Sequence, residues 1–212
     1  VILDELGLGY ERREEITTPT VEERATATPT LQVPTLWDGE TTLWESGLIA
    51  DYLLSNYTER PDADPPLAAT VARPENKWAD ELVLATIQTL GTTAATISQM
   101  KWSGIAHTDN AFLTRCAERL PYILTWLENN LENEQQGFFE GSLSVQDIFL
   151  TCYLGFIANR PIGLEPNLNG YPKIKAMVTR VEERASFQEN PILWWEPGVI
   201  GYADDGKTPL YE

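Results

Sequence analysis

The fold is decided by two stretches of sequence, Gln32-Val-Pro-Thr-Leu36 and Leu43-Trp-Glu-Ser-Gly-Leu-Ile-Ala-Asp-Tyr-Leu53. Between them lies Asp38-Gly39, and an Asp-Gly pair between two β-prone runs is typical of a β-hairpin. The second stretch continues as a predicted helix, because its apolar residues from Leu48 onward share one helical face and Ser46 is a suitable N-cap. We therefore predict a hairpin that leads directly into a helix.

Pro34 lies inside the first strand of this predicted hairpin. A proline has no N–H group to donate to a strand ladder. The residues alone leave two alternatives: the strand is at a sheet edge there, or the Val33–Pro34 bond is cis.

The segments around the hairpin are short and mixed. The pattern over residues 1–9 predicts the end of an amphipathic helix that stops at Gly7, and residues 10–16 are expected to form a short strand. Residues 17–29 are expected to form a loop with one helical turn, and residues 58–70 a proline-rich linker.

The remainder of the chain predicts helices. They cover Pro74–Met100, Phe112–Leu131 with a kink or restart at Pro121, a helix opened by the capping-box-like Ser144-Val-Gln-Asp147, and Tyr171–Glu183. The aromatic tail Phe187–Glu212 has little periodicity, and we expect it to drape over these helices. A small mixed region followed by helices alone predicts two domains.

Composition excludes several classes of partner. The net charge is −17, from 32 acidic and 15 basic residues, and such a field repels nucleic acid and anionic membranes. No apolar run is long enough to cross a bilayer, and no signal peptide is visible. Cys116 and Cys152 lie on apolar helix faces and are expected to be buried, reduced thiols; with His107 as the single histidine, no metal site is expected.

Four segments, in this order, resemble the cytosolic glutathione transferase family: 3–11, Gln32–Leu36, Leu43–Leu53 and Ser144–Ile148. The resemblance implies an α+β thioredoxin-like N-terminal domain, incomplete at its start, over 1–59. It implies an all-α C-terminal helical bundle domain with an extended tail over 60–212. It also implies a cytoplasmic homodimer that uses glutathione as co-substrate. The apolar residues on two faces of the long helix, Trp78 and Leu82 against Leu84 and Ile87, favour the dimer as well.

The resemblance assigns a glutathione-binding role to Gln32, Val33, Pro34, Glu45 and Ser46. Ser46 at a helix N-terminus would bind the γ-glutamyl carboxylate, and Glu45 would pair with the ammonium group. The backbone of Val33, beside a cis Pro34, would hold the cysteinyl part as an added strand, and Gln32 would lie near the glycyl end. The alternatives are a helix cap at Ser46, a surface charge at Glu45 and a strand-edge proline.

The acceptor substrate, an electrophilic small molecule, is expected between the domains. The resemblance assigns to this pocket five residues of the C-terminal half of the long helix and just beyond it: Thr92, Thr96, Gln99, Met100 and Trp102. Packing within the domain is the alternative for all five. Trp194 and Trp195 either cover the same cleft or hold the tail in place.

The family's thiol-activating Ser, Tyr or Cys belongs before the first residue of this sequence, so the catalytic residue is left unassigned. The function implied is transfer of the glutathione thiolate to an electrophile. Two alternatives are a non-catalytic interaction module with the same fold, and a glutathione-dependent reductive cleavage, dehalogenation or isomerisation.

Overall fold

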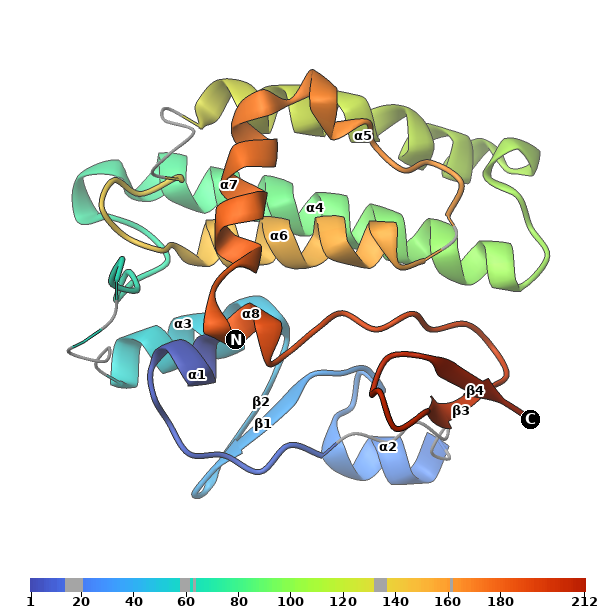
Figure 1. The fold of residues 1–212 in the computed structure, drawn as a ribbon, viewed down its shortest axis with the longest axis horizontal. Coiled ribbons are helices and arrows are strands. Elements are labelled where there is room, and N and C mark those ends of the chain that lie inside the picture. The colour runs from blue at the N-terminus through green and yellow to red at the C-terminus, as the bar shows by residue number, and fades with distance from the viewer. Residues whose placement is uncertain (14–20, 58–61, 63, 132–136, 161) are drawn as a thin grey trace.

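The computed structural model describes residues 1–13, 21–57, 62, 64–131, 137–160 and 162–212. Its elements are α1 Ile2–Glu5, α2 Val21–Ala27, β1 Thr35–Asp38, β2 Thr41–Trp44, α3 Ser46–Asn56, η1 Pro74–Asn76, α4 Lys77–Trp102, η2 His107–Asp109, α5 Ala111–Asn130, α6 Val145–Ala158, η3 Leu168–Gly170, α7 Pro172–Glu182, α8 Ala185–Gln188, β3 Val199–Tyr202 and β4 Pro209–Tyr211. Figure 1 shows α5, α4 and α6 side by side, with α7 across them and the smaller N-terminal part below.

The predicted hairpin and the helix after it are confirmed. β1 pairs antiparallel with β2, from Thr35 opposite Trp44 to Asp38 opposite Thr41. Gly39 in the turn has a φ of 58°, which a residue without a Cβ adopts at little cost. α3 follows directly after β2, so the hairpin fixes where this helix begins.

Two expectations for the first thirty residues are wrong. Residues 10–13 form no strand, because among the described residues β1 pairs with β2 alone and offers no ladder to this segment; residues 14–16 of the predicted strand lie outside the described ranges. The single helical turn expected before Pro29 is instead the seven-residue helix α2.

The helical part is built around the apolar faces of α4, α5 and α6. Ile87, Leu90, Leu124, Leu127 and Leu150 are each at most 1% exposed. α5 runs through Pro121 from Ala111 to Asn130, so the predicted restart there is wrong. A proline removes a single N–H donor, and the buried leucines on either side of Pro121 keep the helix packed.

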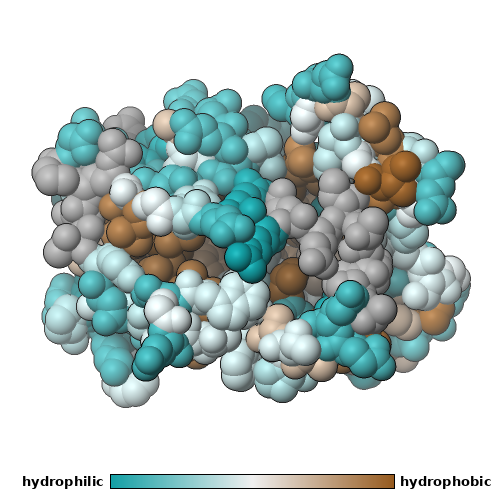
Figure 2. Space-filling view, turned by 90° about the horizontal axis from the view of Figure 1, so that it is seen from below, coloured by the Kyte–Doolittle hydropathy of each residue, from teal (hydrophilic) through white to brown (hydrophobic). Residues whose placement is uncertain are grey.

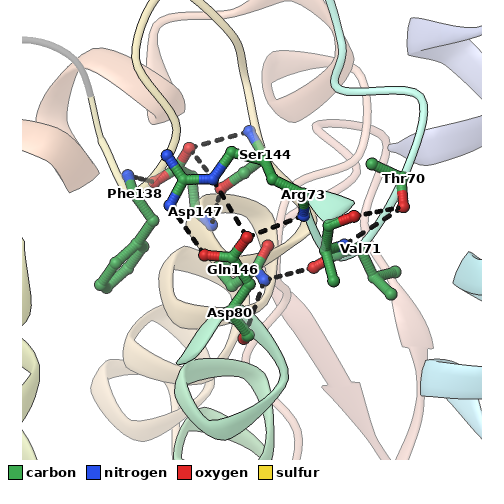
Figure 3. A network of polar contacts seen from close by, with 9 residues as sticks. Thr70, Val71, Arg73, Asp80, Phe138, Ser144, Gln146 and Asp147 are labelled. Carbon is green, nitrogen blue, oxygen red and sulfur yellow. Dashed lines mark hydrogen bonds and ion pairs between the residues drawn. The ribbon is translucent and has the colours of Figure 1, made fainter. Parts of the chain in front are cut away.

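The predicted capping box opens α6 (Figure 3). The Asp147 carboxylate accepts hydrogen bonds from the Ser144 backbone N–H at 2.8 Å and from its hydroxyl at 2.7 Å, and also from the backbone N–H of Phe138 at 3.0 Å. Burial raises the pKa of Asp147 to about 6, although these hydrogen bonds lower it. The start of α6 is therefore fixed by a charged group inside the protein.

Gln146, the residue before Asp147, joins α6 to the start of α4, also in Figure 3. Gln146 donates to the backbone carbonyls of Val71, at 2.6 Å, and of Asp80, at 3.2 Å. Asp80 in turn accepts from the backbone N–H and the guanidinium of Arg73. These contacts hold the α4 and α6 N-termini in one fixed arrangement.

The expectation that the tail drapes over the helical domain holds for its middle part, which packs on the C-terminal ends of α4 and α6, whereas Asn190 bonds to Asp4 of α1. The Arg160 guanidinium donates to the Leu193 carbonyl at 2.6 Å. The rings of Trp102 and Trp195 meet edge to face with centroids 5.0 Å apart. The tail then ends in the β3–β4 hairpin, which its sequence did not lead us to expect.

Both cysteines are free thiols, Cys116 buried and Cys152 half-buried, and burial raises the pKa of Cys152 to about 11. Seen from below in Figure 2, the surface is mostly hydrophilic, with hydrophobic atoms gathered in separate areas. Within the ranges described above, no helix has the length and apolar content to span a membrane. The same ranges contain no cluster of three His, Cys, Asp or Glu side chains that could hold a metal ion.

Candidate functional site

The hairpin brings the two predicted glutathione-binding segments to the same end of its ladder. Thr35 pairs with Trp44 at this end, so Val33 and Pro34 lie just before one strand of the pair and Glu45 and Ser46 just after the other. The Val33–Pro34 peptide bond is cis, as the family resemblance implies. The two segments are therefore neighbours in space, on adjoining extensions of β1 and β2.

The first segment is open to a ligand. The Val33 side chain is 87% exposed, and Gln32 and Pro34 are exposed as well. Among the described residues, no hydrogen bond occupies the backbone N–H or carbonyl of Val33. An exposed backbone stretch of this kind can pair with an extended peptide as an added strand.

The second segment differs from the prediction in one respect. The N-cap of α3 is Glu45, and Ser46 is the first helical residue. The Glu45 carbonyl accepts the first helical hydrogen bond, from the Ile49 N–H at 3.0 Å, which leaves Ser46 with helical geometry. The Ser46 side chain is consequently not used as a cap, and the N–H groups of the first turn still point out of the helix end.

Glu45 has a φ of 71°, which is unusual for a residue with a side chain. Such a conformation costs on the order of 1–3 kcal/mol, and residues held in this way are concentrated at ligand-binding sites. In this position Glu45 projects from the turn between β2 and α3, immediately before the helix N-terminus. A carboxylate there can pair with a cationic group that a helix end alone would repel.

Two glycines mark close contacts near the start of α3, one between α3 and α4 and the other between α4 and α6. A Cβ built on Gly47 would lie 2.3 Å from Nε2 of Gln88, on α4. A Cβ built on Gly91, one turn further along α4, would lie 2.3 Å from Cε1 of Tyr153, on α6. The side chain of Tyr153 also lies near that of Ser46. Residues of α3, α4 and α6 therefore meet at Ser46.

Burial raises the pKa of Tyr153, the Ser46 side chain nearby lowers it, and the neighbouring Cys152 and Glu45 raise it further. The net result is a pKa above the ordinary value, so the hydroxyl keeps its proton at neutral pH. The sequence placed Tyr153 on the inward face of its helix but gave it no role at the site. Gly91 was the available signal, because a glycine inside a helix indicates the close approach of another group.

The five candidate acceptor residues lie along the second half of α4. Thr92 and Gln99 are exposed and Thr96 partly so, with the Thr96 hydroxyl donating to the Thr92 carbonyl at 2.8 Å. Met100 and Trp102 are half-buried, and Trp102 contacts Trp195 of the tail. Within the described ranges, no hydrogen bond or ion pair joins these five residues to the hairpin segments, so the acceptor pocket stays a prediction.

Two cavities lie elsewhere, beside α7. A groove of about 550 Å³ is lined by Asn169, Pro172, Lys175, Ala176, Thr179, Arg180 and Glu183. A smaller one of about 200 Å³ lies between α7 and the segments around Pro65 and Leu143. Neither contains a residue of the predicted site.

Together these features describe a thioredoxin-like domain with a small sheet, in which a cis-proline segment faces a helix end, joined to an all-helical domain. Comparison with known protein families gives two matches: Glutathione S-transferase, N-terminal domain, over residues 1–61, and Glutathione S-transferase, C-terminal domain, over residues 99–189. The chain belongs to the glutathione S-transferase family. No curated protein is similar enough to the sequence to count as a match.

Solved structures show the same fold. A glutathione S-transferase from Methylobacterium radiotolerans, in complex with glutathione sulfonate, has a TM-score of 0.70 at 19% identity, covering 88% of this chain and 84% of its own. One from Methylobacillus flagellatus, with glutathione bound, has a TM-score of 0.69 at 19% identity, covering 89% of each chain. A class Gtt2 enzyme from Vibrio parahaemolyticus has a TM-score of 0.64 at 24% identity, covering 88% and 87%.

Proposed function

We propose that this chain binds glutathione between the Val33 backbone and the start of α3, and transfers the glutathione thiolate to an electrophilic small molecule. The observation that carries the proposal is the end of the hairpin ladder, where Thr35, next to Pro34, pairs with Trp44, two residues before the start of α3 at Ser46. Two proteins of the same fold have glutathione or glutathione sulfonate in their structures, which supports this ligand for the present chain.

Each part of glutathione has a partner of matching chemistry. The Ser46 hydroxyl and the first-turn N–H groups of α3 bind the γ-glutamyl carboxylate, where the helix dipole favours an anion. Glu45 pairs with the γ-glutamyl ammonium. The N–H and carbonyl of Val33 pair with the cysteinyl backbone next to Pro34, and Gln32 donates toward the glycyl carboxylate.

The reaction forms a bond between the glutathione sulfur and an electrophilic carbon. The sulfur supplies the electron pair, its proton goes to solvent or to a base, and the acceptor releases a leaving group or takes the pair into a conjugated system. A thiol with a pKa near ~8.5 must be brought down by ~2 units, which takes about 2.7 kcal/mol. We assign this activation to none of the residues of this sequence. The acceptor is expected beside Thr92, Thr96, Gln99, Met100 and Trp102.

Titration calorimetry with glutathione tests the binding step. Ser46→Ala should weaken binding by about 1–2 kcal/mol, the usual loss of a hydrogen bond to a charged group. Ser55→Ala is a matched control, because Ser55 is an exposed serine at the other end of the same helix. Wild-type protein that shows no binding at millimolar glutathione contradicts the proposal. Binding without conjugation of a chlorinated nitroarene would instead favour the non-catalytic module.

We also propose that the protein is a cytoplasmic homodimer, as the family resemblance implies. α4 supports the dimer because it is apolar on two sides. Leu84 and Ile87 are buried in the domain core, whereas Trp78 is 80% and Leu82 is 56% exposed. A second copy of the chain would remove this exposed apolar surface from water.

A further inference from the structure

We propose that the electrophile used by this protein is an aromatic carboxylate, and that Arg160 binds its carboxylate group where the C-terminal ends of α4 and α6 meet the tail. The inference rests on the proposed function, because it names the class of electrophile that the function leaves open. It is carried by a half-buried guanidinium that has no carboxylate partner within the described ranges, and by the aromatic rings and hydrogen-bond donors near it.

Arg160 differs from two other arginines at packed positions of the chain. Arg73 forms an ion pair with Asp80 at 2.8 Å, and Arg184 forms one with Glu5 at 2.7 Å. No Asp or Glu side chain among the described residues lies within ion-pair distance of Arg160. Burial lowers the pKa of Arg160, as expected for a cation whose desolvation is not offset by an anion. A ligand that carries a negative charge would supply this partner.

The Arg160 guanidinium has one edge with which it can still bind a ligand. Its Nη1 donates to the backbone carbonyls of Asn159, at 2.9 Å, and of Leu193, at 2.6 Å. In the part of the chain that the structure describes, Nε and Nη2 make no hydrogen bond, although they carry three N–H groups. Arg73 and Arg184 use these same two nitrogens to bind their carboxylates. The geometry is therefore that of a bidentate carboxylate site.

Aromatic rings lie around this guanidinium. It lies over the ring of Phe156 on α6, 5.3 Å from the ring centroid. The tail, which passes below α6 in Figure 1, connects it to the end of α4, because Leu193 accepts from Arg160 and Trp195 meets the ring of Trp102. Leu193 and Trp195 are two residues apart, a backbone span of at most about 7 Å. A planar ligand bound to Arg160 would therefore have aromatic surfaces to pack on.

Two polar groups near the end of α4 lack a hydrogen-bond partner within the described ranges. They are the Ser98 hydroxyl and Nε1 of Trp102, and both atoms are buried. Ser98 is 1% exposed, and Trp102 follows it by four residues, on the same face of the helix. An indole N–H can only donate, and a serine hydroxyl can donate as well. Because buried polar groups are nearly always paired, these two favour a ligand with acceptor oxygens.

Titration calorimetry with chloronitrobenzoate and chloronitrobenzamide, without glutathione, tests the inference. The two compounds have the same ring and differ in the negative charge. We expect the wild type to bind the benzoate about tenfold or more tightly than the benzamide, as for hydrogen bonds to a charged group. Arg160→Gln should raise the dissociation constant of the benzoate about tenfold and leave that of the benzamide unchanged. The comparison of the two compounds uses unaltered protein, so it decides the matter even if the variant does not fold.

Arg119→Gln is the matched control, because Arg119 is an exposed arginine on α5 and its replacement removes the same charge. It should leave the dissociation constant of the benzoate unchanged. Arg160→Gln should leave that of glutathione unchanged. If Arg160 served only to fasten the tail to the end of α6, its replacement would affect the benzoate and the benzamide alike.

Three outcomes overturn the inference. If the wild type binds glutathione but binds the benzoate and the benzamide equally well, the carboxylate is not recognised, whereas the proposed function stands. If Arg160→Gln weakens the binding of both compounds by the same factor, Arg160 does not bind the carboxylate. If the benzoate binds selectively but the protein does not conjugate it with glutathione, the benzoate is not an electrophile for this protein, and the inference fails.

Discussion

Glu5 and Arg184 are 179 residues apart in the sequence, and their side chains form a bidentate ion pair. Nε of Arg184 lies 2.8 Å from Oε1 of Glu5, and Nη2 lies 2.7 Å from Oε2. Burial alone would raise the pKa of Glu5, but hydrogen bonds from Arg184 and Ser186 bring it below its ordinary value. The pair fastens α1, at the start of the chain, to the junction of α7 and α8.

Replacing Arg184 by leucine should lower the free energy of unfolding by about 3–5 kcal/mol, because Glu5 would remain buried without its charged partner. Urea denaturation measures the loss. Arg13→Leu is the control, since Arg13 and Glu11 form an exposed ion pair, with 73% and 75% of the side chains accessible. Its effect should stay below about 1 kcal/mol. Equal losses in the two variants would contradict the prediction.

Asp147 should make stability depend on pH in the sense opposite to that of most carboxylates. Its pKa is about 6 in the folded protein against 3.8 as the ordinary value, so the folded state binds the proton more tightly. The stabilising contribution is complete below pH 3.8 and is lost as the pH rises through about 6. As the pH rises from 3.8 to about 6, the wild type should therefore lose unfolding free energy relative to Asp147→Asn. A difference that does not vary with pH would show that Asp147 stays ionised.

Gly47 and Gly91 should tolerate alanine differently. Gly91→Ala places a methyl group against the rigid ring of Tyr153, and we expect a loss of about 1–3 kcal/mol even though alanine favours a helix. Gly47→Ala meets only the amide end of Gln88, a flexible side chain that can move aside, so its effect should be within about 0.5 kcal/mol. Thermal unfolding of the two variants makes the comparison. In Gly91→Ala, the further change Tyr153→Leu should restore part of the stability.

Charge on the exposed apolar face of α4 should separate the proposed dimer. Leu82→Glu adds a charge next to Trp78, where burial against a second copy would leave it unpaired. Light scattering should then give the mass of one chain for the variant and of two for the wild type. Val21→Glu is the control, because Val21 is 64% exposed on α2 and should not affect the mass. A wild-type mass of one chain would refute the dimer.

Local sequence was sufficient for the parts of the fold that depend on neighbouring residues. The Asp38–Gly39 turn, the helix after Ser46 and the Ser144–Asp147 capping box are each specified within a few positions, and all three are present. The cap of α3 was predicted one residue too late, because a glutamate in the sequence does not indicate the unusual φ that Glu45 adopts. Backbone geometry imposed by packing is not visible in composition.

The tail shows a local signal that was overlooked. Asp205-Gly206 lies between β3 and β4 as Asp38-Gly39 lies between β1 and β2. The flanking runs are short, however, and Pro209 occupies the second strand, which weakens the pattern. The contact between Tyr153 and Ser46 had no such signal, because it joins two domains and depends on how α3, α4 and α6 are packed.

The close packing of position 153 on position 91 has an evolutionary consequence. A side chain at one position takes the volume that the other requires, so substitutions at the two sites should be accepted only in pairs. Among relatives that keep an aromatic residue at 153, glycine should persist at 91. Lineages that acquire alanine or serine at 91 should carry a smaller residue at 153.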